Sequence, residues 1–338
     1  MQISTALPFD APIIAVPTIP GIQICRPMLE HGRSVIARLF GRRAFGYGRL
    51  PAAMTLPADS PVNAFSVDVE DWYQVADFDA VVPFDSWDKY ESRVRRNTDK
   101  VLQLLDEFGV KGTFFILTWN AERWPDIVRT IHGAGHEIAS HGYAHRIVYE
   151  QTREQFHADV ARAKKTLEDI TGEAVLGYRA PSFSFTAKSQ WGPDVLLELG
   201  YRYDSSVFPV KDSLYGMPDA ERFPYVIREK DGRRLIEFPI TTTEIFGRNM
   251  PLGGGGWLRI FPYAYMKWGM RRVNRQEGKG TVFYIHPWEV DPDHPRMKTA
   301  GRRGFSSHYV NLARTEGKLR KLLRDFRFAP MRDCLSLS

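Results

Sequence analysis

Apolar positions along the chain change their spacing in a regular way from residue 64 onward. In residues 64–70, AFSVDVE, every second side chain is apolar, which is typical of a β-strand with one buried face. Residues 152–172 instead carry apolar side chains at helical spacing, begin with the Thr152–Gln155 pair of a capping box and end at Gly172. The same two patterns predict strands at 64–70, 112–117, 136–140, 174–179, 234–240 and 280–286, and helices near 101–108, 125–133, 152–172 and 191–199.

Short apolar strands that alternate with amphipathic helices predict an α/β fold with parallel strands and the helices outside. A barrel and a doubly wound sheet both fit, because periodicity does not distinguish them. In either architecture the functional site lies at the carboxyl ends of the strands. Charged or imidazole side chains occur at or just past the predicted strand ends: Asp68, Glu70, His141, Arg179, Asp204 and His286.

The two ends of the chain differ from this central part. Residues 1–60 are rich in proline and arginine and have no sustained periodicity, so we interpret them as a poorly ordered leader. Met54 is an alternative natural start. The strand and helix repeats occupy residues 61–290, and residues 291–338 are expected to form a helical extension that packs on them.

Composition excludes several classes of protein. The chain has 338 residues and a net charge of +6, but it contains no block of like charges, so nucleic-acid binding is not expected. Its two cysteines, Cys25 and Cys334, are too few for a disulfide framework. There is no apolar run of transmembrane length. The apolar residues 11–25 contain three prolines and follow no basic residue, which is a poor secretory signal, so we expect a cytoplasmic location.

The segment SHGYAH places His141 and His145 four residues apart. In a helix this spacing would put both imidazoles on one face. Two histidines and one carboxylate form a three-ligand metal site with an open position for water. Asp68 and Glu70 share one face of their strand, so one can bind the metal while the other acts as a base. If the strand turns at its end, Asp71 could replace Glu70.

Three other features have simpler explanations when taken alone. His286 ends the apolar strand in FYIHPWE, where a lone histidine is more often structural than catalytic. Arg179 would ordinarily be assigned to a surface salt bridge. The glycine run 253–256 lacks the Lys-Ser/Thr pair of a phosphate-binding loop, so we interpret it as a mobile loop.

Taken in order, the motifs resemble the polysaccharide deacetylase family, the NodB homology domain of the carbohydrate esterases. The resemblance covers about residues 62–290 and rests on FSVDVEDW, SHGYAH, RAPSF, YDSS and YIH. The segments HPWEVDPDHPR and HYVNLARTEGKLRKLLRDFRF further resemble the subfamily encoded in exopolysaccharide loci that also carry an exosortase.

This resemblance implies a distorted (β/α) barrel, usually of seven strands, that removes N-acetyl groups from amino sugars with the help of a divalent metal ion. The substrate would be an acetylated amino-sugar polymer or oligosaccharide resembling N-acetylglucosamine. The resemblance also assigns roles by motif: metal ligands His141 and His145, base Asp68, its orienting Arg179, acid His286, and Asp204, which tunes the acid.

The first motif departs from the family pattern. The metal-binding aspartate normally follows the base directly, and Val69 stands at that position here. Strand alternation points to Glu70 as the third ligand. Two imidazoles and a carboxylate suit Zn²⁺, Co²⁺ or Fe²⁺ alike, and we expect Zn²⁺. Two other functions remain open: an inactive carbohydrate-binding relative, and a hydrolase of another non-peptide C–N bond.

Overall fold

A computed structural model describes residues 61–212, 214–297 and 307–337. The predicted leader at 1–60 and the alternative start at Met54 lie outside the described residues. The core is a sheet in which seven neighbouring strands run parallel, and an eighth, β6 (Tyr225–Lys230), forms an antiparallel hairpin with the last of them. In spatial order the seven are β10 (Val282–Ile285), β1 (Asn63–Val69), β2 (Thr113–Ile116), β3 (Glu137–Ser140), β4 (Gly177–Tyr178), β5 (Tyr203–Asp204) and β7 (Arg233–Glu237).

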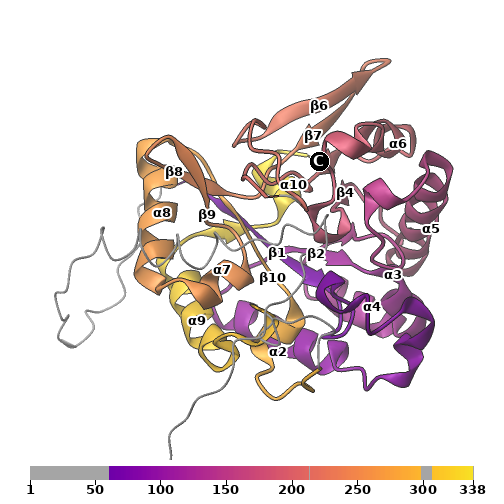
Figure 1. Cartoon of the computed structure of the whole chain (residues 1–338), viewed down its shortest axis with the longest axis horizontal. Helices are drawn as coiled ribbons and strands as arrows, with labels where there is room; N and C mark the ends of the chain where they lie inside the picture. The colour runs from indigo at the N-terminus through magenta and orange to yellow at the C-terminus, as the bar shows by residue number, and fades with distance from the viewer. Residues whose placement is uncertain (1–60, 213, 298–306, 338) are drawn as a thin grey trace, which may run out of the picture. The chain divides into compact units, whose positions relative to one another are not determined.

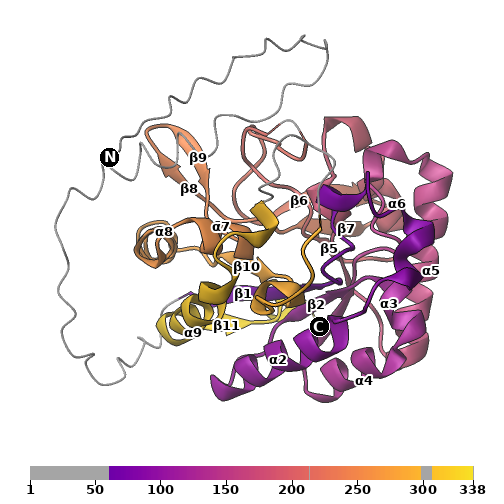
Figure 2. The same cartoon turned by 60° about the horizontal axis from the view of Figure 1, so that its bottom comes forward.

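Helices surround the curved sheet on its outer side (Figure 1; Figure 2). Four of them connect the first strands: α2 (Val94–Glu107), α4 (Pro125–Gly133), α5 (Arg153–Thr171) and α6 (Gly192–Glu198). A short α3 (Thr118–Arg123) precedes α4, and the later part of the chain adds α7 (Gly255–Ile260), α8 (Tyr263–Gln276), α9 (Thr315–Asp325) and α10 (Met331–Cys334). This arrangement confirms the predicted α/β fold with parallel strands.

The barrel is incompletely closed. Among the described strands, no ladder joins β7 to β10. The Val282 amide at the start of β10 donates a 2.6 Å hydrogen bond to Thr241 Oγ1, which follows β7 in the sequence. The chain between these strands forms a separate hairpin of β8 (Thr242–Ile245) and β9 (Arg248–Pro251). The expected distortion of the barrel therefore lies between the two end strands of the parallel order, β10 and β7.

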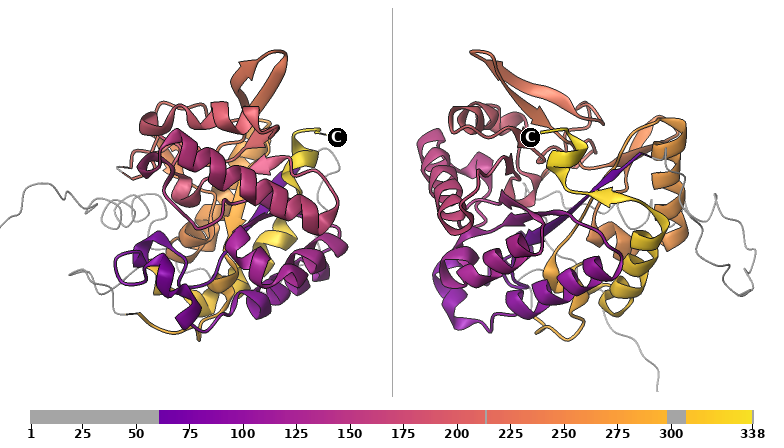
Figure 3. Two further views of the ribbon diagram at one scale, coloured as in Figure 1. Left: turned by 90° about the vertical axis from the view of Figure 1, so that its right-hand side faces the viewer. Right: turned by 180° about the vertical axis from the view of Figure 1, so that it is seen from behind.

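The C-terminal segment returns to the start of the barrel. Strand β11 (Phe328–Ala329) pairs in parallel with the beginning of β1, and Figure 3 shows it beside that strand. The Met331 amide then donates a 2.7 Å hydrogen bond to Thr113 Oγ1 on β2. These contacts attach residues 328–334 to the sheet, while the predicted domain boundary at 290 stays a prediction.

Two local patterns show where sequence reasoning held and where it failed. Helix α5 has its capping box, with the Gln155 amide donating to Thr152 Oγ1, and ends at Gly172 in the left-handed region. Strand β1, however, is buried on both faces, because its polar side chains point into the barrel interior. Among the described residues, no helix is both long and apolar enough to cross a membrane.

The glycine run 253–256 was predicted to be a mobile loop, but in the structure it leads into helix α7 and forms its first residues. A Cβ atom at Gly253 would lie 2.3 Å from the Val282 carbonyl oxygen, so the backbone of this run packs directly on β10. The sequence pattern could not show this, because the contact joins segments that are about thirty residues apart.

Candidate active site

Three buried side chains meet at the carboxyl ends of β1 and β3. Glu70, His141 and His145 each offer a ligand atom, and these atoms all lie within 4.8 Å of one another. Glu70 Oε2 is 3.1 Å from His145 Nε2. The structure thus brings together the three residues that the sequence suggested as metal ligands.

A turn, and not a helix, places the two histidines together. His141 continues β3, because its amide donates to the Ile116 carbonyl at 2.9 Å. Gly142 then has a φ of +72° and His145 a φ of +53°, both in the left-handed region. The Thr118 amide holds the turn by donating to the Gly142 carbonyl. The one-face argument from helical spacing was therefore wrong in its geometry.

The cluster suits a divalent metal ion. Burial lowers the pKa of His141 and of His145 to about 4, so both imidazoles are neutral at physiological pH and keep a lone pair for a metal. His141 Nδ1 lies 2.8 Å from the Arg179 carbonyl oxygen and donates to it, which leaves Nε2 available. Within the described structure, Glu70 Oε2 and His145 Nδ1 are buried without a hydrogen bond, a cost that a bound cation would offset.

Near His141, Arg179 holds the Asp68 carboxylate. The guanidinium Nη1 donates to Asp68 Oδ1 at 2.6 Å and to Ser66 Oγ at 2.9 Å. Its Nε and Nη2 donate to the backbone and side-chain oxygens of Ser205. The Arg179 side chain is fully buried, so it is not a surface salt bridge, and its four contacts fix the carboxylate in one orientation.

The chain just after Arg179 is strained. Ser182 and Phe183 both have φ values near +52°, a region that costs side-chain-bearing residues energy. Non-glycine residues in this region cluster at functional sites. Both residues belong to the RAPSF motif, so the unusual backbone lies within a motif that carries the family resemblance.

His286 contacts the cluster through Glu70. Its Nε2 is 3.0 Å from Glu70 Oε1, and its Nδ1 is 3.3 Å from Glu289 Oε2. Burial alone would lower the pKa of His286, but the Glu70 and Glu289 carboxylates raise it to about 10. Burial would likewise raise the pKa of Glu289, but Arg259 and His286 lower it to about 2. His286 is thus a cationic donor next to the ligand cluster.

The structure corrects the prediction for Asp204. This carboxylate is fully buried at the end of β5, where Ser206 Oγ donates to it and Glu237 lies against it. Asp204 makes no described contact with His286. The carboxylate that lies next to the His286 ring belongs to Glu289 instead. Sequence reasoning missed Glu289, although HPWE places a carboxylate three residues after the histidine.

Asp71 does not join the cluster either. Its Oδ2 accepts hydrogen bonds from Ser92 Oγ at 2.7 Å and from the Arg93 amide at 2.8 Å. Its Oδ1 accepts from the Trp72 amide. Because these contacts fix the carboxylate at the start of α2, the geometry favours Glu70 over Asp71 as the third ligand.

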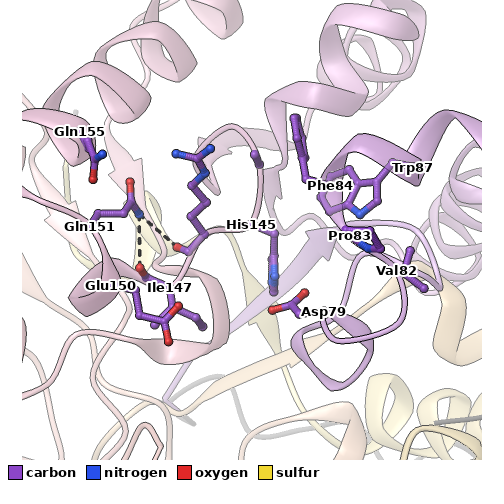
Figure 4. A pocket seen from close by; sticks show the side chains of 12 residues that line it. Asp79, Val82, Pro83, Phe84, Trp87, His145, Ile147, Glu150, Gln151 and Gln155 are labelled. Atoms are coloured by element: carbon purple, nitrogen blue, oxygen red, sulfur yellow. Dashed lines mark hydrogen bonds between the residues drawn. The ribbon is translucent and has the colours of Figure 1, made fainter. Parts of the chain in front are cut away.

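A cavity of about 360 Å³ opens beside His145 (Figure 4). One wall comes from residues 79–87 and includes Phe84 and Trp87, and the other comes from residues 144–155. Burial, with help from the nearby Glu150, raises the pKa of Asp79 on its rim to about 6. A hollow with aromatic and polar walls next to a ligand cluster is where a substrate would bind.

Comparison with known families divides the chain into two parts. Residues 78–203 match the family described as polysaccharide deacetylase, and residues 205–336 match a domain of unknown function, DUF3473. The chain therefore carries a segment similar to polysaccharide deacetylases, followed by a DUF3473 segment. Asp68 and Glu70 lie ahead of both matched segments.

Known relatives carry deacetylase names. The chain is 29% identical over 141 residues to a peptidoglycan deacetylase of Helicobacter pylori, which covers 42% of this chain and 44% of that protein. It is 33% identical over 84 residues to a peptidoglycan-N-acetylglucosamine deacetylase of Bacillus cereus, covering 25% and 30%. The chain thus spans less than half the length of these relatives.

Solved structures share the fold. A putative polysaccharide deacetylase of Mycobacterium smegmatis matches 85% of this chain and 94% of its own, with a TM-score of 0.55 and 22% identity. A probable polysaccharide deacetylase of Pseudomonas aeruginosa matches 88% and 97%, with a TM-score of 0.56 and 17% identity. The similarity confirms the barrel class predicted from the sequence.

Proposed function

We propose that this protein is a metal-dependent hydrolase that removes N-acetyl groups from an amino-sugar polymer or oligosaccharide. The observation that carries the proposal is the cluster of Glu70, His141 and His145 with two candidate proton-transfer groups beside it. Asp68 lies near enough to His141 to influence its charge, and His286 Nε2 lies 3.0 Å from Glu70 Oε1. Hydrolysis of an amide needs both a base for water and an acid for the leaving amine.

The residues have distinct tasks in this reaction. Glu70, His141 and His145 would hold a divalent ion, for which we propose Zn²⁺, and the ion would polarise the acetamide carbonyl and acidify a water molecule. Asp68 accepts the proton of the attacking water. Arg179 keeps the Asp68 carboxylate oriented through its 2.6 Å contact. His286 Nε2 donates a proton to the amine nitrogen as the C–N bond breaks.

For the substrate we propose an N-acetylglucosamine-like polymer. The peptidoglycan deacetylases named above support this class, as does a relative named chitooligosaccharide deacetylase from Azorhizobium caulinodans, which is 32% identical over 85 residues. A place in exopolysaccharide biosynthesis is proposed from the resemblance of the C-terminal segment. The cytoplasmic location stays a prediction.

Metal content and acetate release together test the proposal. The purified protein should contain about one equivalent of zinc by elemental analysis and release acetate from acetylated chitooligosaccharides. Asp68→Asn should keep the metal and lose about 100-fold or more in turnover, because it removes the base. His145→Ala should lose both metal and activity.

Two outcomes would contradict this assignment. Full activity of Asp68→Asn would remove Asp68 from the mechanism. A wild-type protein that takes up no metal, even after incubation with zinc, would favour the inactive carbohydrate-binding alternative. Because Asp68→Asn leaves Arg179 without its ionic partner, thermal unfolding of each variant must show that the fold is intact.

A further inference from the structure

The Glu289 carboxylate is fully buried, and each of its two oxygens accepts a hydrogen bond. Oε1 accepts a 2.7 Å hydrogen bond from Arg259 Nε. Oε2 accepts from the His286 amide at 3.0 Å and lies 3.3 Å from His286 Nδ1. A buried carboxylate is costly unless it is paired and hydrogen-bonded. Here all of its described partners belong to Arg259 and His286.

Arg259 is fixed from its other side as well. Its side chain is only 4% exposed, and Nη1 donates to the His308 carbonyl at 2.7 Å. The guanidinium also lies over the Trp288 ring, 5.2 Å from its centre. Arg259 therefore cannot swing away, and it holds Glu289 against the histidine.

The glycine run gives this carboxylate its place. A Cβ atom at Gly255 would lie 1.9 Å from Glu289 Oε2, so a side chain there would displace the carboxylate. Four residues later the same helix, α7, presents Arg259 to the other oxygen. The segment GGGGWLR thus supplies both the space for Glu289 and its cationic partner.

From these contacts we propose that Glu289 and Arg259 are positioning residues for His286, and that the DUF3473 segment completes the active site. The Glu289 carboxylate keeps a proton on Nδ1, so Nε2 is the nitrogen that gives its proton to the leaving amine. After that transfer the ring is neutral, with its remaining proton still facing Glu289. This role in catalysis rests on the proposed function, whereas the contact itself does not.

The assignment gives a physical role to a segment of unknown function. His286, Glu289 and Arg259 all belong to residues 205–336, whereas His141 and His145 belong to the deacetylase segment. Strand β10, which carries His286 at its end, pairs directly with β1, which carries Asp68. The DUF3473 segment is therefore part of the same barrel and not an accessory module.

The first test does not depend on turnover. Nitrogen-15 imidazole spectra of the metal-free protein should show a proton on His286 Nδ1 that exchanges slowly with water. The signal is assigned by its loss in His286→Asn. In Glu289→Gln, and also in Arg259→Gln, this proton should exchange at least about tenfold faster, in line with the loss of a supporting hydrogen bond. An unchanged His286 signal in a folded Glu289→Gln protein would overturn the proposal.

A matched control lies in the same segment. Glu277 forms a partly buried ion pair with Arg222, whose Nη1 lies 2.8 Å from Glu277 Oε2. Glu277→Gln removes a comparable charge pair away from the site. It should leave the His286 signal and the turnover unchanged, and an equal effect in this variant would assign the changes to general loosening of the fold.

Kinetics provide the second test. Glu289→Gln should lower kcat by about 10- to 100-fold with little change in KM, because it acts after the substrate is bound. In a His286→Asn background the same substitution should cost nothing more, since its effect passes through the imidazole. An equal loss in both backgrounds would mean a structural role only. If the wild-type protein releases no acetate, the proposed function fails, while the imidazole spectra still decide this inference.

Discussion

The histidines of this protein show how neighbours decide the charge of one residue type. His141 and His145 are buried where no carboxylate outweighs the loss of hydration, and their pKa falls to about 4. His286 is also buried, but it lies between two glutamates, and its pKa rises to about 10. The same side chain therefore occurs here as two neutral imidazoles, the proposed metal ligands, and as a cationic one, the proposed proton donor.

His136 permits a pH test outside the site. It is buried, its Nδ1 accepts a hydrogen bond from the Gly112 amide, and burial lowers its pKa to about 4. Below pH 6.5 the unfolded chain binds a proton at this residue and the folded chain does not, so stability falls between pH 6.5 and about 4. From pH 7.5 to 5 this residue should cost about 2 kcal/mol.

Urea unfolding at both pH values measures this cost. His136→Asn keeps an acceptor near the Gly112 amide but cannot titrate, so its loss of stability from pH 7.5 to 5 should be smaller by that amount. The exposed His157→Gln serves as the control and should follow the wild type. Equal pH dependence in His136→Asn and the wild type would contradict the prediction.

At this scale, local patterns revealed some site residues and missed others. Alternation along β1 pointed to Asp68 and Glu70, which do face the site. Glu289 was missed because its role depends on Arg259, which lies thirty residues away and meets it only in the folded barrel. The family resemblance assigned Asp204 to His286, whereas its described contacts are with Ser206 and Glu237.

At the scale of elements, the turn after β3 decides where the two proposed metal ligands, His141 and His145, lie. Gly142 has a φ of +72°, and a Cβ atom there would lie 2.9 Å from Asp159 Oδ2. That oxygen accepts the Tyr143 amide, so Gly142→Ala would disturb the turn between the two histidines. We expect a loss of about 1–2 kcal/mol in stability and a zinc affinity about tenfold weaker.

Gly172→Ala separates these two effects. Gly172 also has a φ of +72°, but it ends α5 with no atom near its missing side chain. The Gly172→Ala protein should lose about as much stability as Gly142→Ala but keep the zinc affinity of the wild type, as measured by competition with a chelator. If both variants bind zinc equally well, the turn does not position the ligands.

Predictability also differed between elements. Helix α5 was predicted with its two ends, because nineteen residues carry a full apolar stripe and both caps. Strands β4 and β5 have two residues each, too few for any periodicity to show their bounds. The glycine run was misread because its glycines allow close contacts that form only in the folded chain. Gly253 packs on the backbone of β10, and Gly255 packs on the Glu289 carboxylate.

At the scale of the molecule, the parallel order of strands brings together side chains that are far apart in the sequence. β10 lies beside β1, so His286 meets Glu70 across more than two hundred residues. The α/β class with parallel strands could be predicted from the alternation of strands and helices, whereas the barrel was expected only from the family resemblance. The cavity could not, since most of its lining comes from residues 79–87 and 144–152, which lie outside the strands and α-helices and have no repeating pattern.

The cavity leads to a prediction about substrate binding. Phe84 is partly buried on the cavity wall, with its ring 5.0 Å from that of Trp87. If a sugar ring packs there, Phe84→Ala should raise KM for an acetylated chitooligosaccharide by about 2- to 10-fold, which corresponds to about 0.5–1.5 kcal/mol of aromatic contact. kcat should change little, because the contact is the same before and during the reaction.

Phe246→Ala is the matched control, since Phe246 is 88% exposed in the turn between β8 and β9. A KM that stays constant in Phe84→Ala would place the sugar outside this cavity, and a rise in both variants would indicate a nonspecific effect.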